Sequence, residues 1–152
     1  MPILLAVACL TGCASTVSLQ PAENANHPAC ADVSLRLPDS VDGQQRRGTD
    51  AQATAAWGDP ASVILTCGVP ELGPTTLPCT PVNGVDWVID ESEAPRYRVT
   101  TFDRTPAVEI YLDNDVVSSA QVLDRLSQIV TVLPRHGSVC TDAATTGAES
   151  EG

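Results

Sequence analysis

Two short stretches of the chain place a tryptophan indole beside a carboxylate. Trp57 and Asp59 belong to the run Trp-Gly-Asp, and Asp86 directly precedes Trp87. This combination suits sugar binding, because an aromatic face can stack on the ring while a carboxylate accepts hydrogen bonds from its hydroxyl groups. The alternative is that both indoles fill the core, which is reasonable in a chain that is only 3% aromatic. All four residues are therefore candidate ligand-binding residues.

The same two carboxylates raise an enzymatic alternative. An acid and a base on either side of a glycosidic bond can hydrolyse it, and Asp59 and Asp86 are the candidates for such a pair. The chain has two histidines, His27 and His136, and neither lies near a G-x-S-x-G nucleophile motif. Residues 113–115 lack the glycine and the later glutamate of a calcium loop. We therefore assign no catalytic residue and expect neither a metal nor a cofactor, with a glycan hydrolase as the alternative.

The basic residues are all arginines and are few. Acidic residues number 19 against 8 basic ones, which gives a net charge of -11. Such a surface repels phosphate backbones, so nucleic acid is not an expected partner. Four arginines are candidates for binding an anionic polymer or a lipid headgroup; the alternative is that they pair with the surplus of surface carboxylates. These four are Arg46, Arg47, Arg98 and Arg104.

The N-terminal segment contains a cysteine whose thiol is a candidate for lipid attachment. Residues 2–10 are apolar and uncharged, too short for the roughly 20 residues of a membrane-spanning helix but suited to a signal peptide. The run Leu-Thr-Gly-Cys ending at Cys13 resembles the lipobox of bacterial lipoproteins, in which the cysteine receives a diacylglyceryl group and the chain is cleaved before it. Two or more acyl chains anchor a protein stably. We expect a lipid-anchored protein on the extracytoplasmic face of the cell membrane; the alternative is a plain signal peptide or a buried N-terminal strand.

Four further cysteines lie beyond Cys13: Cys30, Cys67, Cys79 and Cys140. In an oxidising compartment an even count predicts two disulfides with three possible connectivities. Cys67 and Cys79 flank a loop rich in proline and glycine that is easy to close, which favours their pairing and leaves Cys30 to pair with Cys140. A zinc site is not expected, because no C-x-x-C spacing is present.

Composition divides the chain into four parts. Residues 1–12 are the expected signal peptide, cleaved before Cys13. Residues 13–29 are polar and broken by prolines, which predicts a flexible tether. Residues 30–140 are long enough for a single globular domain. Residues 141–152 have no apolar periodicity, which predicts a disordered acidic tail.

The first half of the domain has mixed patterns. The alternation in residues 33–38 predicts an edge strand, and the polar residues 39–50 predict a loop. Helix formers in residues 50–58 predict a short helix that ends at Gly58. The apolar, β-branched run over residues 61–67 predicts a central strand buried on both faces.

The second half predicts three strands and a helix. Residues 85–90, 97–103 and 107–113 form an antiparallel meander whose register places one set of apolar side chains inward: Val85, Trp87, Ile89, Tyr97, Val99, Val108, Ile110 and Leu112. Apolar residues at helical spacing predict an amphipathic helix over residues 118–133, capped by Ser118 and stopped by Pro134. The expected fold is α+β: a two-layer, mostly antiparallel sheet of four to five strands, covered by one long C-terminal helix and stapled by disulfides.

Several short motifs occur in order between residues 37 and 107. They are Leu37-Pro38, Gln45-Arg46-Arg47, Ala56-Trp57-Gly58-Asp59-Pro60-Ala61, Cys67-Gly68-Val69-Pro70, Cys79, Asn83-Gly84-Val85-Asp86-Trp87, Arg104 and Pro106-Ala107. Together they resemble a family of secreted or lipid-anchored actinobacterial proteins labelled domain of unknown function 3515. The resemblance implies an exported domain of the cell envelope, and it implies no activity. As partner we expect an envelope protein or a glycan.

Overall fold

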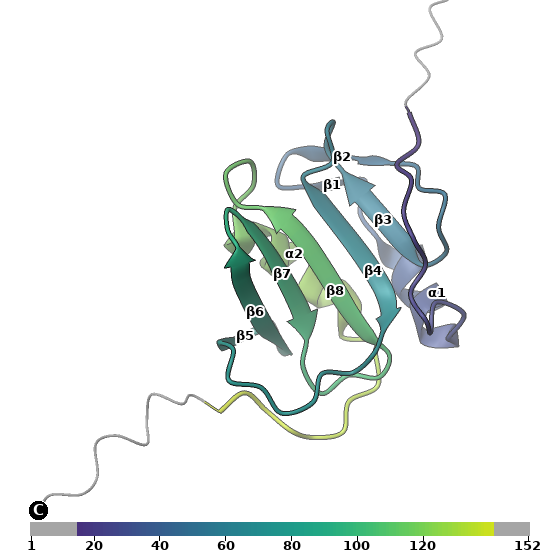
Figure 1. Cartoon of the computed structure of the whole chain (residues 1–152). Helices are drawn as coiled ribbons and strands as arrows, with labels where there is room; N and C mark the ends of the chain where they lie inside the picture. The colour runs from purple at the N-terminus through teal and green to yellow at the C-terminus, as the bar shows by residue number, and fades with distance from the viewer. Residues whose placement is uncertain (1–14, 142–152) are drawn as a thin grey trace, which may run out of the picture.

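The computed structural model describes residues 15–141, and Figure 1 shows them as one antiparallel sheet with two helices behind it. The expected signal peptide, Cys13 and all of the expected acidic tail except Thr141 lie outside these residues. The sheet and both helices contribute side chains to a single hydrophobic cluster. The predicted α+β class with one sheet is therefore confirmed.

The sheet among these residues has eight strands rather than the expected four or five. In space their order is β1-β2-β3-β4-β8-β7-β6-β5, and every neighbouring pair is antiparallel. The chain therefore makes two four-stranded meanders that join where β4 pairs with β8. The strands are β1 (Ser40–Val41), β2 (Gln44–Arg47), β3 (Thr54–Trp57), β4 (Val63–Val69), β5 (Cys79–Val82), β6 (Val85–Glu93), β7 (Arg96–Thr101) and β8 (Ala107–Asp113).

The predicted meander of the second half is confirmed as β6, β7 and β8. Ile89 lies opposite Val99, which in turn lies opposite Ile110. The predicted register is also confirmed, because the inward-facing residues are fully or partly buried in the shared core. β5 precedes this meander, and Asn83 and Gly84 form the two-residue turn to β6 with φ values of 48° and 81°. Both residues adopt the left-handed conformation that such hairpins require.

The C-terminal helix is confirmed but is shorter than expected. α2 (Ser119–Val130) begins at Ser118, whose hydroxyl accepts a hydrogen bond from the backbone N–H of Gln121. Its apolar stripe is buried against the sheet. The chain leaves the helix at Thr131, before Pro134. The fold therefore has two short helices instead of one long helix.

The edge strand expected over residues 33–38 is wrong, because this stretch belongs to helix α1 (Pro28–Arg36). Pro28 occupies the first turn, where its missing N–H costs nothing, and the His27 ring accepts from Ala29 N at 3.1 Å. Residues 30, 33 and 37 are buried at helical spacing. Leu35, which alternation would bury, is 86% exposed.

Residues 39–58 contain the three short strands β1, β2 and β3, where a loop and a short helix were expected. Asp42 and Gly43 make a tight turn between β1 and β2, with φ values of 45° and 76°. The alanine-rich stretch before Gly58 is β3, and all four of its residues are buried against β4 and the core. A helix of this length has little stability of its own. Burial in the sheet therefore outweighs the local helix preference.

The central position predicted for residues 61–67 is confirmed, but burial on both faces is wrong. β4 lies between β3 and β8. Val63, Leu65 and Cys67 are buried, whereas Ile64 and Thr66 are partly exposed on the other face. The alternation follows from the architecture, because the two helices cover only one side of the sheet.

Both disulfides join different cysteines from the favoured pairs. Cys30 on α1 is bonded to Cys67 on β4, and Cys79 on β5 is bonded to Cys140. The favoured pairing of Cys67 with Cys79 is wrong because these residues lie on strands separated by three others. Four strand spacings amount to about 19 Å, whereas the Cα atoms of a disulfide lie within about 7 Å of each other.

This connectivity predicts the result of a non-reducing peptide map. Combined cleavage after arginine and glutamate separates all four cysteines, because Glu71 lies between Cys67 and Cys79. We expect one linked pair containing Cys30 and Cys67, and another containing Cys79 and Cys140. A linked peptide joining Cys67 to Cys79 would contradict the topology. Replacing Cys30 and Cys67 together by alanine should lower the free energy of unfolding by about 4 kcal/mol, measured by urea denaturation.

Candidate functional site

A groove runs along the end of the sheet at which β4 ends. The loop of residues 70–78 crosses this end from central β4 to edge strand β5, and the C-terminal segment returns to the same end (Figure 1). Between them lies a groove of about 820 Å³. Its apolar lining includes Leu72, Leu77, Pro78, Val88, Phe102 and Val139. The Cys79–Cys140 disulfide lines it as well.

Asp103 fastens the C-terminal wall of the groove. It is buried, with a left-handed φ of 58°, and its Oδ2 atom accepts hydrogen bonds from His136 N at 3.0 Å and Gly137 N at 2.6 Å. Burial alone would raise the pKa of Asp103, but the backbone donors, Gly137 foremost, outweigh burial and lower it. The carboxylate therefore holds the chain after α2 in place while it is ionised.

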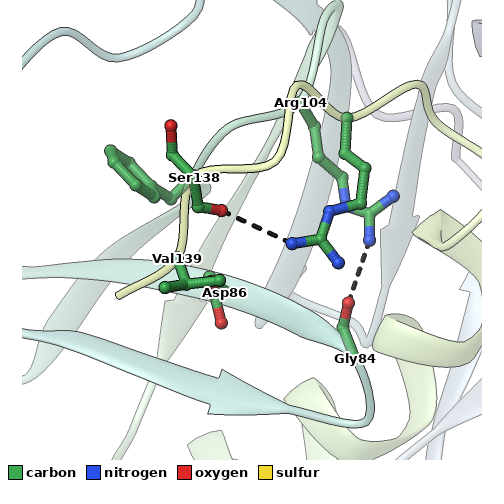
Figure 2. Close-up of a pocket in the computed structure, with 7 residues that line it drawn as sticks. Gly84, Asp86, Arg104, Ser138 and Val139 are labelled. Carbon is green, nitrogen blue, oxygen red and sulfur yellow. Dashed lines mark hydrogen bonds between the residues drawn. The ribbon is translucent and has the colours of Figure 1, made fainter. Parts of the chain in front are cut away.

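Arg104 is a buried cation that ties three segments together. Its guanidinium donates to the carbonyls of Thr131 at 3.1 Å, Leu133 at 2.6 Å and Gly84 at 2.9 Å. Figure 2 shows the contact with Gly84 in the β5–β6 turn. Burial lowers the pKa of Arg104, and the neighbouring charge of Arg135 lowers it further. Arg104 therefore fastens the end of α2 to the β5–β6 hairpin.

A second, smaller pocket of about 100 Å³ lies beside Arg104 (Figure 2). Asp86 lines it and accepts a hydrogen bond from Cys140 N at 2.9 Å. Arg135 lines it too and donates to the carbonyl of Ser138 at 3.5 Å. A volume of this size corresponds to about three water molecules. The polar side chains of the pocket thus serve mainly to fasten the C-terminal segment.

A hydroxyl, an imidazole and a carboxylate meet where Glu71 lines the groove. Thr105 Oγ1 donates to Glu71 Oε2 at 2.6 Å and lies 2.9 Å from His136 Nε2. Glu71 Oε2 is 3.7 Å from the same ring nitrogen. In a catalytic triad the carboxylate instead orients the ring through its second nitrogen. The cluster therefore acts as a latch between the crossing loop and the C-terminal segment, and no local sequence motif signals it.

The two indoles lie in the core and not at the groove. Trp57 and Trp87 are both 0% exposed. Trp57 Nε1 donates to the carbonyl of Pro38 at 3.0 Å, and Trp87 Nε1 donates to Ser127 Oγ at 2.8 Å. The core interpretation of the tryptophans is therefore confirmed. Neither indole presents a face on which a sugar ring could stack.

The structure does not bring Asp59 and Asp86 together. Asp59 is exposed in the β3–β4 turn and pairs with Arg47 at 3.2 Å. Asp86 lies near the start of β6, at the opposite end of the strands and three strand positions beyond β4. Three spacings alone amount to about 14 Å, whereas glycosidase carboxylates lie about 5–9.5 Å apart. Asp59 and Asp86 are therefore too far apart to act as the acid and base of the hydrolase alternative.

The four candidate arginines do not form one basic patch. Arg46 on β2 donates to the carbonyl of Leu37, and the adjacent Arg47 binds Asp59. Arg98 on β7 binds Glu109 at 2.7 Å and Glu93 at 3.4 Å, with its guanidinium over the Tyr111 ring. Arg104 is buried, as described above. The alternative interpretation, that the arginines pair with carboxylates, is therefore correct for Arg47 and Arg98, whereas Arg46 and Arg104 bind backbone carbonyls.

Residues 15–141 contain neither a cluster of metal-binding side chains nor a helix that could span a membrane. Within this range no three or more His, Cys, Asp or Glu side chains gather closely enough to bind a metal ion. Neither α1 nor α2 has the length and apolar character needed to cross a membrane, and the described chain contains no other candidate.

The contacts of Asp103 predict how acid destabilises the groove. Because its folded pKa lies below the ordinary aspartate value of about 3.9, the ionised carboxylate stabilises the fold above that pH. The contribution is lost as the pH falls through the lower, folded pKa. Asp103→Asn should reduce the urea midpoint at pH 7 and flatten its decline on acidification. Asp115→Asn, at an exposed position, is the control and should change neither; equal curves for the two variants would contradict the role of Asp103.

A protein-family model matches most of this chain. No curated protein and no solved structure matches the chain significantly. Residues 3–137 match the family described as "Protein of unknown function (DUF3515)". This range includes both meanders, both helices and the start of the C-terminal wall. Since the match spans most of the sequence, the chain belongs to this family of proteins of unknown function.

Proposed function

We propose that this chain is a lipid-anchored, non-enzymatic accessory protein of the cell envelope that binds a segment of another envelope protein in the groove. The observation that carries the proposal is the groove itself, walled by an exposed loop and by a segment that a disulfide fastens. The two disulfides indicate an extracytoplasmic protein, because such bonds persist in oxidising compartments.

The residues that line the groove favour a protein segment, rather than a glycan, as its ligand. Apolar side chains such as Leu77 and Val139 are 42% and 57% exposed there. Glycan sites use exposed aromatic faces, whereas both tryptophans of this chain are buried and the one aromatic side chain of the groove lining, Phe102, is partly buried. Extended peptide segments bind through pockets for apolar side chains. Because the chain carries a net charge of -11, a neutral or basic segment is the better fit.

The arrangement of polar groups supports binding over catalysis. The hydroxyl of Thr105 lies beside His136, but Glu71 approaches the ring nitrogen that faces the hydroxyl. Asp86 and Asp103 are both committed to backbone N–H groups of the C-terminal segment. These side chains hold the walls of the groove and leave no oriented base for a nucleophile.

Site-specific crosslinking in the host cell tests the groove. A photoreactive amino acid in place of Leu77 should crosslink reproducibly to one envelope protein. The same residue in place of Val116, which is 56% exposed in the β8–α2 turn at the other end of the sheet, is the matched control and should give no such product. The proposal fails if position 77 gives no product, or if both positions give the same one.

The intact mass of the protein extracted from host membranes tests the anchor. We expect a chain that begins at Cys13 and carries acyl groups. Alkylation should add mass at four cysteines only after reduction, because these four form the disulfides. The Cys13→Ser variant should lack the acyl mass. A native chain that begins elsewhere without acyl groups would remove the anchor from the proposal.

A further inference from the structure

Residues 15–27, which the sequence suggests are a flexible tether, lie against the domain; we call them the strap. In Figure 1 the strap is the dark purple segment that runs along the side of the sheet formed by β3 and β4 and leads into α1. The expectation of a tether is wrong for these residues, because backbone and side-chain groups of the domain bind them along their length.

Arg47 holds the first described residue of the strap. Its Nη2 atom donates to both the backbone carbonyl and the hydroxyl of Ser15, each at 2.6 Å. The other terminal nitrogen, Nη1, donates to the carbonyl of Gly58 and to Asp59. The Arg47 side chain is only 13% exposed. It therefore joins the start of the strap to the β3–β4 turn.

Asp50 holds the next residues of the strap. Its two carboxylate oxygens accept from Leu19 N at 2.8 Å and from Ser18 Oγ at 2.7 Å. Val17 adds two backbone hydrogen bonds, one to Gly48 O and one from Asp50 N. The hydrogen bonds from Leu19 and Ser18 lower the pKa of Asp50. The carboxylate is therefore ionised at neutral pH and keeps both contacts.

The last part of the strap is fixed at Gly68. Asn24 N donates to Gly68 O at 2.9 Å, and Ala25 is buried. A Cβ atom at Gly68 would lie 2.5 Å from the backbone carbon of Asn24, and the φ of 102° also requires glycine. The backbones therefore touch directly at this point. The strap therefore contacts the sheet near both of its ends.

The two ends of the strap lie at opposite ends of the sheet. Ser15 contacts the arginine that binds the β3–β4 turn, whereas Gly68 lies near the end of β4, where the crossing loop begins. The seven residues of β4 span about 23 Å. The groove is therefore at the end of the sheet that is distant from Ser15.

We propose that the strap holds the β3–β4 end of the domain close to a lipid bilayer and directs the groove away from it. This inference rests on the proposed lipid attachment at Cys13. Two residues of chain reach at most about 7 Å, so a lipid on Cys13 places Ser15 close to the membrane surface. A flexible coil over residues 13–27 would instead give an average separation of about 21 Å.

The charges at this end are unfavourable for direct binding of the protein surface to a membrane, so the proposed attachment depends on the lipid. Four exposed carboxylates lie at this end of the sheet, in the turns or at the end of β6: Asp59, Glu91, Glu93 and Asp115. Anionic headgroups repel such a surface over about one Debye length, roughly 10 Å at 0.1 M salt. The strap contacts must therefore hold the acidic end near the bilayer against this repulsion.

Energy transfer on vesicles tests the orientation. The chain of residues 13–152, with its disulfides intact, is coupled through the Cys13 thiol to a maleimide phospholipid in phosphatidylcholine vesicles that carry an acceptor on some headgroups. A donor replaces either Val116 or Leu77, which lie at the near and far ends of the sheet. We expect strong transfer from position 116 and at least twofold weaker transfer from position 77.

Removing the strap contacts should abolish this difference. In Arg47→Ala/Asp50→Ala, transfer from position 116 should fall toward that from position 77, and it should fall further when phosphatidylglycerol is added at low salt. Arg98→Ala/Glu109→Ala removes one arginine and one carboxylate from a pair outside the strap and should keep the difference. Circular dichroism of each variant checks that the domain remains folded.

Three results would overturn the proposal: equal transfer from both positions in the unmodified chain, stronger transfer from position 77, or a strap variant that keeps the full difference. If the strap variant unfolds, Arg47→Lys and Asp50→Asn provide milder tests of the same contacts. Chemical coupling makes the measurement independent of acylation in the cell. If the intact mass shows no acyl groups, the proposed natural anchor is wrong. If the energy transfer shows no difference between the two positions, only the proposed orientation is wrong.

Discussion

The pairing of β4 with β8 is the constraint on which the rest of the structure depends. It joins two meanders that are distant in sequence, with Val63 opposite Leu112 and Cys67 opposite Val108. Since β8 is the last strand of its meander, this pairing sends β5 to the far edge of the sheet. The chain must then cross one end of the sheet between residues 70 and 78, and this crossing creates the groove.

Buried polar side chains fasten the segment after α2 to the same end of the sheet. Arg104 binds carbonyls from the end of α2 and from the β5–β6 turn, and Asp103 binds backbone N–H groups beyond α2. A buried charge is tolerated only when hydrogen bonds replace its water. Both residues lie in the short turn between β7 and β8, so this one turn holds the segment after α2. That segment forms a wall of the groove, and the Cys79–Cys140 disulfide fastens it there.

The two ends of the sheet differ in chemistry. The end near Ser15 carries exposed carboxylates and the arginine that holds the strap. The other end carries exposed apolar side chains and a partly exposed disulfide. The Cys30–Cys67 disulfide, in contrast, is fully buried between α1 and β4. This division is consistent with attachment at one end and binding at the other.

Local periodicity determined the elements whose stability depends on their own pattern. The strands β6 to β8, their register and the amphipathic helix α2 follow from repeats of two and of about 3.6 residues. The even number of cysteines and the scarcity of aromatic residues likewise pointed to two disulfides and to buried indoles. Only the tertiary structure decided that residues 54–57 pair as a strand, that residues 28–36 are helical, that the strap is docked, and which cysteines are bonded. It also separated Asp59 from Asp86 and brought Glu71, Thr105 and His136 together. Each of these depends on contacts between residues far apart in sequence, chiefly those set by the β4–β8 pairing, and no local pattern encodes them.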